Sequence, residues 1–175
     1  MKINLIAAIS LNGKIAQSRN QSSLEWTSKE DTAFFIEKTK ESGTVIMGQR
    51  TFDTIGKPLK GRRLIVLTLD ASMKEKNVPP DGNGTRLEFV EEAPVDLIRR
   101  LESEGVTSVV IGGGSFVYSS FLREQLVTDV FLTIEPILFG EGISLAESFG
   151  DVKLKLVESK MLGEQTVLLH YSVSS

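Results

Sequence analysis

The sequence predicts an α/β domain built on a mixed, mostly parallel sheet. Apolar runs that suit β-strands alternate with helical patterns along most of the 175 residues. Two of these runs end in glycine and lead directly into a helical segment, as strands of a parallel sheet commonly do. The last two runs flank Gly163 and Glu164, which predicts an antiparallel hairpin at the C-terminal edge. No repeat or linker divides the chain, so we expect one domain over residues 1–175.

The first elements follow from apolar runs and capping residues. Residues 2–9 form a β-compatible run, and the polar residues 10–28 read as a long loop. Loops of this length inside a compact domain are usually functional. Ser28 is placed to cap a helix that runs to about Glu41 and ends at Gly43.

The remaining elements are predicted in the same way. We expect strands at residues 44–47, 63–68, 86–90, 106–111, 127–137, 152–161 and 166–173. We expect helices at residues 49–55, 93–105 and 115–124. Residues 70–85 are rich in proline, glycine and charge, which predicts a surface excursion.

Composition excludes several classes of function. Hydrophobic residues make up 41% and charged residues 25%, with a net charge of -3, so no nucleic-acid partner is expected. The absence of cysteine and the single histidine, His170, leave no ligands for a thiolate or multi-histidine site, and we expect no metal. The apolar N-terminal run is too short for a membrane span, so we expect a cytoplasmic protein without a membrane partner.

The two glycine junctions are candidate phosphate sites. They lie at residues 44–51 and 108–115, each at the end of a predicted strand. Glycine lets the backbone approach a phosphate, and the following helix N-terminus offers unpaired N–H groups. Arg50 follows the first glycine closely enough to meet a phosphate. The glycine spacing does not match the Rossmann pattern, and the alternative is that these glycines only make tight turns.

Asp31 is the candidate group for proton chemistry. It begins an apolar helical stretch that contains Phe34 and Phe35, five residues after the only tryptophan, Trp26. Partial burial against these aromatic residues would raise the proton affinity of its carboxylate. The alternative is an ordinary acid in the first helical turn, where the helix dipole favours it.

The chain resembles dihydrofolate reductase over nearly its whole length. The resemblance rests on residues 5–10, 26–31 and 34–35, on the block at 45–56 with 58–62, and on residues 110–114 and 131–133. It implies a single-domain, three-layer fold and NADPH-dependent reduction of 7,8-dihydrofolate to tetrahydrofolate. The substrate partner would be dihydrofolate or a related pterin or pyrimidine, and the protein a monomer or homodimer.

The resemblance also implies roles for individual residues. Asp31 would pair with the pterin ring and promote its protonation, Trp26 would hold an ordered water, and Thr133 would hydrogen-bond Asp31. Ile6, Ala7, Phe35 and Ile55 would line the substrate cleft, and Arg62 would bind the glutamyl α-carboxylate. The residues implied for NADPH are Ala8, Ile15, Ala16, Gly48, Gln49, Arg50, Thr51, Leu67, Thr68, Ile111, Gly112, Gly113, Gly114 and Ser115.

Two segments instead resemble the reductase domain of riboflavin biosynthesis, which acts on a phosphoribosylamino-pyrimidine. These are residues 10–16, together with residues 126–130 and 135–142. That branch usually has an acid before its glycine run, where this chain has Ile111. That branch also usually lacks the arrangement that this chain has at residues 52–62. Asp70 lies near the place expected for a 2′-phosphate and would repel it. The expected preference for NADPH over NADH therefore depends on Arg50 and on the resemblance. A nucleotide-binding module without catalysis is the third alternative.

Overall fold

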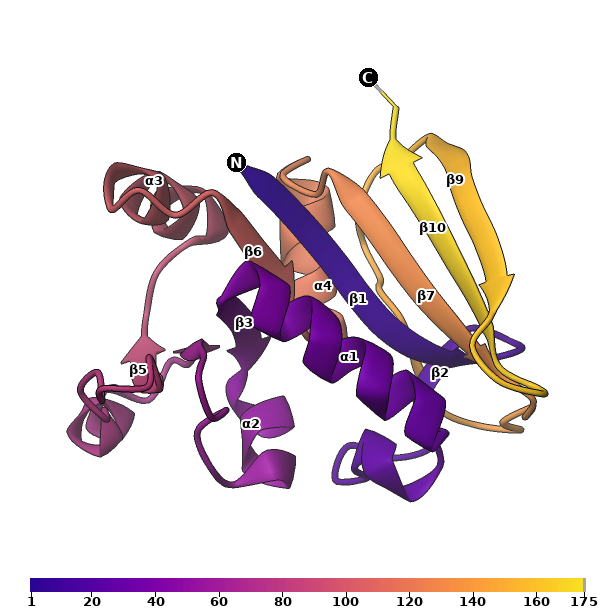
Figure 1. The fold of residues 1–175 in the computed structure, drawn as a ribbon, viewed down its shortest axis with the longest axis horizontal. Helices are drawn as coiled ribbons and strands as arrows, with labels where there is room; N and C mark the ends of the chain where they lie inside the picture. The colour runs from indigo at the N-terminus through magenta and orange to yellow at the C-terminus, as the bar shows by residue number, and fades with distance from the viewer. Residues whose placement is uncertain (175) are drawn as a thin grey trace.

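An eight-stranded mixed sheet forms the centre of the computed structural model, which describes residues 1–174 (Figure 1). The strand order is β5-β4-β3-β6-β1-β7-β10-β9. Its strands are β1 (Lys2–Ser10), β3 (Thr44–Gly48), β4 (Arg63–Leu67), β5 (Arg86–Val90), β6 (Ser108–Ile111), β7 (Asp129–Glu135), β9 (Leu154–Met161) and β10 (Val167–Val173). The first six strands in this order run parallel to one another, β10 runs antiparallel to β7, and β9 runs antiparallel to β10. The predicted fold class is confirmed.

Helices cover both faces of the sheet and make three layers. The helices are α1 (Lys29–Ser42), α2 (Gln49–Ile55), α3 (Pro94–Ser103) and α4 (Ser115–Arg123). In Figure 1, α1 crosses in front of β1 and β6, whereas α4 lies behind them. Alternating side chains of β1 explain the arrangement, because Ile6 packs with Phe34 of α1 and its neighbours Leu5 and Ala7 pack in the cluster of α3 and α4.

Helix α1 begins and ends as its sequence predicts. The Ser28 hydroxyl accepts a hydrogen bond of 3.1 Å from the Asp31 backbone N–H, which satisfies one unpaired donor of the first turn. Gly43 ends the helix with φ of 74°, a left-handed conformation that glycine adopts without strain. These two caps fix where Asp31 lies relative to the sheet.

The long loop is more ordered than predicted. Residues 10–28 contain the short strand β2 (Lys14–Ala16), which pairs antiparallel with β8 (Ile143–Ser144), and the 3₁₀ turn η1 (Ser23–Glu25). A second turn, η2 (Ala71–Lys76), lies in the predicted surface excursion. The prediction of a strand over residues 127–137 was too long, because β7 ends at Glu135 before Pro136 and its chain then turns toward β8.

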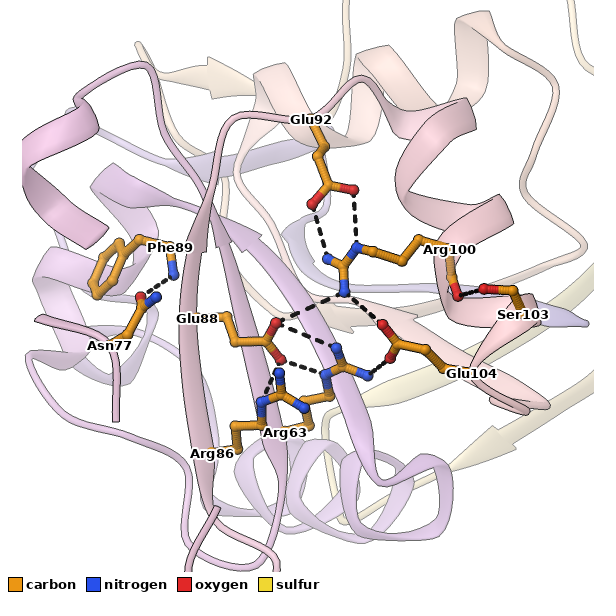
Figure 2. A network of polar contacts seen from close by, with 9 residues as sticks. All are labelled: Arg63, Asn77, Arg86, Glu88, Phe89, Glu92, Arg100, Ser103 and Glu104. Atoms are coloured by element: carbon orange, nitrogen blue, oxygen red, sulfur yellow. Dashed lines mark hydrogen bonds and ion pairs between the residues drawn. The ribbon is translucent and has the colours of Figure 1, made fainter. Parts of the chain in front are cut away.

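An ion-pair network ties β4 and β5 to α3 (Figure 2). Glu88 of β5 pairs with Arg63 and Arg86, and Arg100 of α3 pairs with Glu92 and with Glu104. Arg63 also pairs with Glu104, which closes the network between the strands and the helix. Arg63 is therefore a structural residue of this network. Its neighbour Arg62 takes no part in the network and is buried elsewhere.

No helix within residues 1–174 is both long and apolar enough to cross a membrane.

Candidate active site

Most of the predicted site residues gather at one edge of the sheet, whereas Arg62 lies before the amino end of β4. Strands β1, β3, β6 and β7 run parallel, so their carboxyl ends meet at the same edge. The first turn of α1, helix α2 and strand β2 all lie at this edge, toward the bottom of Figure 1. The chain therefore brings an acid, an apolar wall and the glycine junctions together from distant positions.

Asp31 is buried between α1 and β7. Asp31 is 8% exposed, and Thr133 of β7 is 1% exposed. The Thr133 hydroxyl donates a hydrogen bond from Oγ1 to Asp31 Oδ1. The Thr133 hydroxyl also lies 3.4 Å from the Ala7 carbonyl oxygen. The resemblance implied this contact between Thr133 and Asp31, which are separated by 102 residues.

Burial raises the pKa of the Asp31 carboxyl above its ordinary value of 3.8, because desolvation penalises the charged form. The hydrogen bond from Thr133 opposes this rise by stabilising the carboxylate. The nearby Thr27 hydroxyl, which forms no hydrogen bond of normal geometry, opposes it more weakly, and the charge of Glu135 adds to the rise. Asp31 is thus suited to hold a proton closer to neutral pH than a surface aspartate.

Two buried polar atoms in the segment that precedes Asp31 have no protein partner. Trp26 Nε1 and the Thr27 hydroxyl are buried and form no hydrogen bond within the described part of the chain. The Trp26 ring is held edge-on against Phe139, with ring centroids 5.0 Å apart. A buried N–H donor and a buried hydroxyl without a protein partner are groups that an ordered water or a polar ligand atom would satisfy.

An apolar wall extends from Asp31 along α1. Phe35 packs against both the cluster of Ile6 and the cluster that Ile55 borders. These three predicted substrate residues therefore lie around one surface. Ala7 differs, because its side chain packs on the opposite face of the sheet with α3 and α4, and only its backbone reaches the site.

Arg62 is a buried arginine without an acid partner. It is 7% exposed, its Nη1 donates to the Thr39 hydroxyl at 2.8 Å, and its Nε donates to the Lys60 carbonyl at 3.2 Å. Burial lowers the pKa of this guanidinium from its ordinary value. It forms no ion pair within residues 1–174. Its remaining donors suit a carboxylate from a ligand.

The two glycine junctions lie in direct contact. The Gly48 N–H donates to the Gly113 carbonyl at 2.8 Å, and the Gly112 N–H donates to Ile46 at 2.8 Å. A Cβ on Gly114 would lie 3.0 Å from Thr51 Oγ1, and one on Gly48 would lie 3.1 Å from Val117. Side chains at these two positions would crowd Thr51 and Val117, and no side-chain hydrogen bond caps the N-terminus of α4. This cradle fits the phosphates of a nucleotide cofactor.

Other residues predicted for the cofactor surround this cradle. Thr68 at the end of β4 donates to the Gln49 side chain, which places Leu67 and Thr68 beside α2. Ile15 and Ala16 lie in β2, held by pairing with β8. That pairing requires Gly142, because a Cβ there would lie 2.4 Å from the Ala16 carbonyl oxygen. The further predicted positions at this edge are Ala8, Arg50, Ile111 and Ser115.

Two residues of the site were missed from the sequence. Tyr118 of α4 is buried and donates its hydroxyl to the Ile6 carbonyl at 2.7 Å, beside Gly113. Glu135 of β7 is 3% exposed and acts on Asp31 through its charge. Sequence reasoning expects Asp31 to be the only ionisable side chain close to the reacting ring, because no histidine, cysteine or second acid lies in the motifs around the proposed cleft. That expectation was wrong, since strand alternation puts Glu135 on the same face of β7 as Thr133.

The raised pKa of Asp31 predicts how stability changes with pH. The folded protein binds this proton more tightly than the unfolded chain, so the charged form of Asp31 destabilises the fold. The free energy of unfolding of Asp31→Asn, minus that of the parent, should rise as the pH climbs from below 3.8 through the folded pKa, and then level off. Urea unfolding across this pH range measures the difference, and about 1.4 kcal/mol corresponds to each unit of pKa change.

Asp70→Asn provides a control of opposite sign. Hydrogen bonds from Ser72 lower the pKa of the exposed Asp70 carboxyl, so this group adds stability as the pH rises. Asp70→Asn should therefore lose a little stability relative to the parent at neutral pH. A difference between Asp31→Asn and the parent that is flat with pH would contradict the raised pKa.

Comparisons with known proteins agree with this geometry. Residues 2–136 match the family model of dihydrofolate reductase. Dihydrofolate reductase type 3 of Salmonella typhimurium is 32% identical over 70% of this chain and 67% of its own length. Dihydrofolate reductase from Enterococcus faecalis, solved with NADP(H) and RAB-propyl, has a TM-score of 0.70 at 21% identity, covering 99% of this chain and 97% of that one.

A riboflavin-pathway enzyme has the same fold. The diaminohydroxyphosphoribosylaminopyrimidine deaminase/5-amino-6-(5-phosphoribosylamino)uracil reductase of Thermotoga maritima has a TM-score of 0.77 at 21% identity. The match covers 99% of this chain but 56% of that protein, so this chain spans about half its length. These two structural likenesses establish the fold, and the match over residues 2–136 shows that the chain belongs to the dihydrofolate reductase family of reductases.

Proposed function

We propose that this protein reduces 7,8-dihydrofolate to tetrahydrofolate with NADPH. The observation that carries the proposal is the placement of Asp31 and Arg62 at two points along α1. Arg62 is held by Thr39, eight residues after Asp31, and a rise of 1.5 Å per residue separates the two positions by about 12 Å along the helix axis. An elongated substrate with a basic heterocycle at one end and a carboxylate at the other matches this spacing.

Each residue of the site has a separate role in the proposed reaction. When bound, the nicotinamide cofactor supplies a hydride to the substrate ring. Asp31 pairs with the ring and favours its protonation, which balances the hydride with a proton. Thr133 fixes the orientation of the Asp31 carboxylate, and Phe35 excludes water on one side of the ring. The glycine cradle at Gly48 and Gly112–Gly114 would hold the cofactor phosphates, and Arg50 is the proposed contact for the 2′-phosphate.

A second candidate is reduction of the phosphoribosylamino-pyrimidine of riboflavin biosynthesis. It is favoured by the contact between the two segments that resemble that branch. The Asn12 side chain donates to the Phe139 carbonyl at 2.7 Å and accepts from the Phe139 N–H at 3.1 Å, and Lys14 bonds Ser144 at 3.1 Å. The two segments thus form one structural unit beside the site. Arg62 can bind a carboxylate or a phosphate, so the preference for dihydrofolate depends on the distance of Arg62 from Asp31 along α1 and not on its charge.

The two functions are separated by following NADPH oxidation with each substrate in turn. Turnover of dihydrofolate, with none of the phosphoribosylamino-pyrimidine, is the expected result. Turnover of the pyrimidine alone would contradict the folate proposal. Binding of NADPH without turnover of either substrate would identify a nucleotide-binding module.

The carboxylate clamp predicts the effect of removing Arg62. Arg62→Ala should weaken dihydrofolate binding by about tenfold to more than a hundredfold, the value of a charge-assisted contact of about 1.5–3 kcal/mol. NADPH affinity should barely change. Ligand-quenched fluorescence of Trp26 gives both dissociation constants.

Arg99→Ala is the matched control for Arg62→Ala. Arg99 is an exposed arginine of α3 that pairs with Asp96 at 3.6 Å, far from the site, so both affinities should be unchanged. Equal losses of dihydrofolate and NADPH affinity in Arg62→Ala would instead mark Arg62 as a structural residue.

A further inference from the structure

A second carboxylate, Glu135, is buried beside the candidate active site. It is the last residue of β7, two positions after Thr133, and is 3% exposed. Its Oε1 accepts hydrogen bonds of 2.8 Å from both the backbone N–H and the hydroxyl of Ser28. Its Oε2 accepts a bond of 3.0 Å from the Thr166 hydroxyl. A buried acid with three donors around it is a built feature of the fold.

Glu135 and Asp31 are joined through Ser28. The Ser28 hydroxyl donates to Glu135 and accepts from the Asp31 backbone N–H at 3.1 Å. Across the same interface, Thr133 of β7 donates to the Asp31 carboxylate. The contacts are reciprocal: Ser28 at the start of α1 holds Glu135 of β7, and Thr133 of β7 holds Asp31 of α1.

The pair carries no compensating cation. Neither carboxylate forms an ion pair with a lysine, arginine or histidine in residues 1–174. Two neighbouring buried acids without a cation do not ionise independently, and the first charge disfavours the second. Three donors surround Glu135, whereas one hydroxyl in hydrogen-bonding geometry meets the Asp31 carboxylate, so Glu135 is the more firmly held of the two side chains.

We propose that Glu135 is a positioning residue that carries the negative charge of this pair, so that Asp31 keeps its proton for the reaction. The proposal deepens the proposed function and rests on it, because it assigns how that site holds its proton. Through Ser28, Glu135 also fixes the first turn of α1 on β7. Glu135 acts only through Asp31 and touches neither substrate nor cofactor.

The electrostatics around Asp31 agree with this assignment. Burial is the main cause of the raised pKa of Asp31, and the charge of Glu135 adds to the rise. From α4, Tyr118 also faces Asp31, and burial raises the pKa of its hydroxyl well above the ordinary value, so Tyr118 contributes no charge. Strand β1 presents only the apolar residues Ile6–Ile9 to this region, and Glu30 is the acidic neighbour on α1 itself.

The test is the titration of the Asp31 carboxyl in Glu135→Gln. Glutamine keeps the size of the side chain and still accepts from Ser28, but it removes the charge. Carboxyl ¹³C NMR of the ligand-free protein follows Asp31 directly, and its midpoint should move to lower pH. The value of kcat/KM above the parent midpoint should fall by about threefold to tenfold, because less Asp31 retains its proton.

Glu30→Gln is the matched control. It removes one acidic charge next to Asp31 in the sequence, from a side chain that reaches toward Gly163 and is half-buried. Water screens such a charge more than that of Glu135, so the Asp31 midpoint should move much less. A midpoint that is unchanged in Glu135→Gln, or that moves equally in both variants, would overturn the proposal and leave Glu135 as a structural anchor of Ser28.

The parent protein provides a second measurement that needs no variant. The same spectra follow both carboxyls, and the proposal requires charge on Glu135 at a pH where Asp31 is still protonated. Charge on Asp31 beside a neutral Glu135 would overturn it. Because these titrations use ligand-free protein, they decide the role of Glu135 even if dihydrofolate proves not to be the substrate.

Discussion

The hydrogen bond between Thr133 and Asp31 is the contact on which the site depends. It fastens the first turn of α1 to β7, and that attachment sets where the rest of α1 lies across the sheet. Phe35 then packs between two core clusters, and Thr39 meets Arg62 at the far end of the helix. A shift of α1 along the sheet would break the contact of Asp31 with Thr133, move Phe35 from its two clusters and move Thr39 away from Arg62 at the same time. The placement of one buried acid is therefore linked to the geometry of the whole candidate site.

The placement of this acid has a cost in stability and a benefit in chemistry. A carboxyl with a raised pKa destabilises the fold once it ionises, and Glu135 increases this cost by adding a second buried acid. Hydroxyls and a backbone N–H donate to both oxygens of Glu135 and to one oxygen of Asp31, which offsets part of the cost. Unfavourable electrostatics concentrated at one place, inside an otherwise consistent fold, are typical of a functional site.

The main strands, the four helices and their order were predictable from the sequence, because each depends on local patterns. The caps Ser28 and Gly43, and the alternation of Ile6 with its neighbours, are properties of short segments. What the sequence did not reveal depends on contacts between distant residues. The pairing of β2 with β8, the network of Arg63 and the hydroxyl of Tyr118 each join residues far apart in the chain. Glu135 was detectable in principle, since it lies two residues after Thr133 on a strand and begins a segment that resembles the riboflavin branch, but that resemblance assigned it no role beside Asp31.

The central claim is that Asp31 is the proton-handling group of a reductase, and single-turnover hydride transfer tests it most directly. The rate is measured in the parent and in Asp31→Asn, with NADPH and dihydrofolate prebound, across the pH range. Asparagine keeps the size and the contact with Thr133 but cannot favour protonation of the ring. We predict that hydride transfer slows by about 10²–10⁴-fold at neutral pH and recovers in part as the pH falls, because solvent then supplies the proton. A rate equal to that of the parent near neutral pH would show that Asp31 only caps a helix, and the account would be wrong.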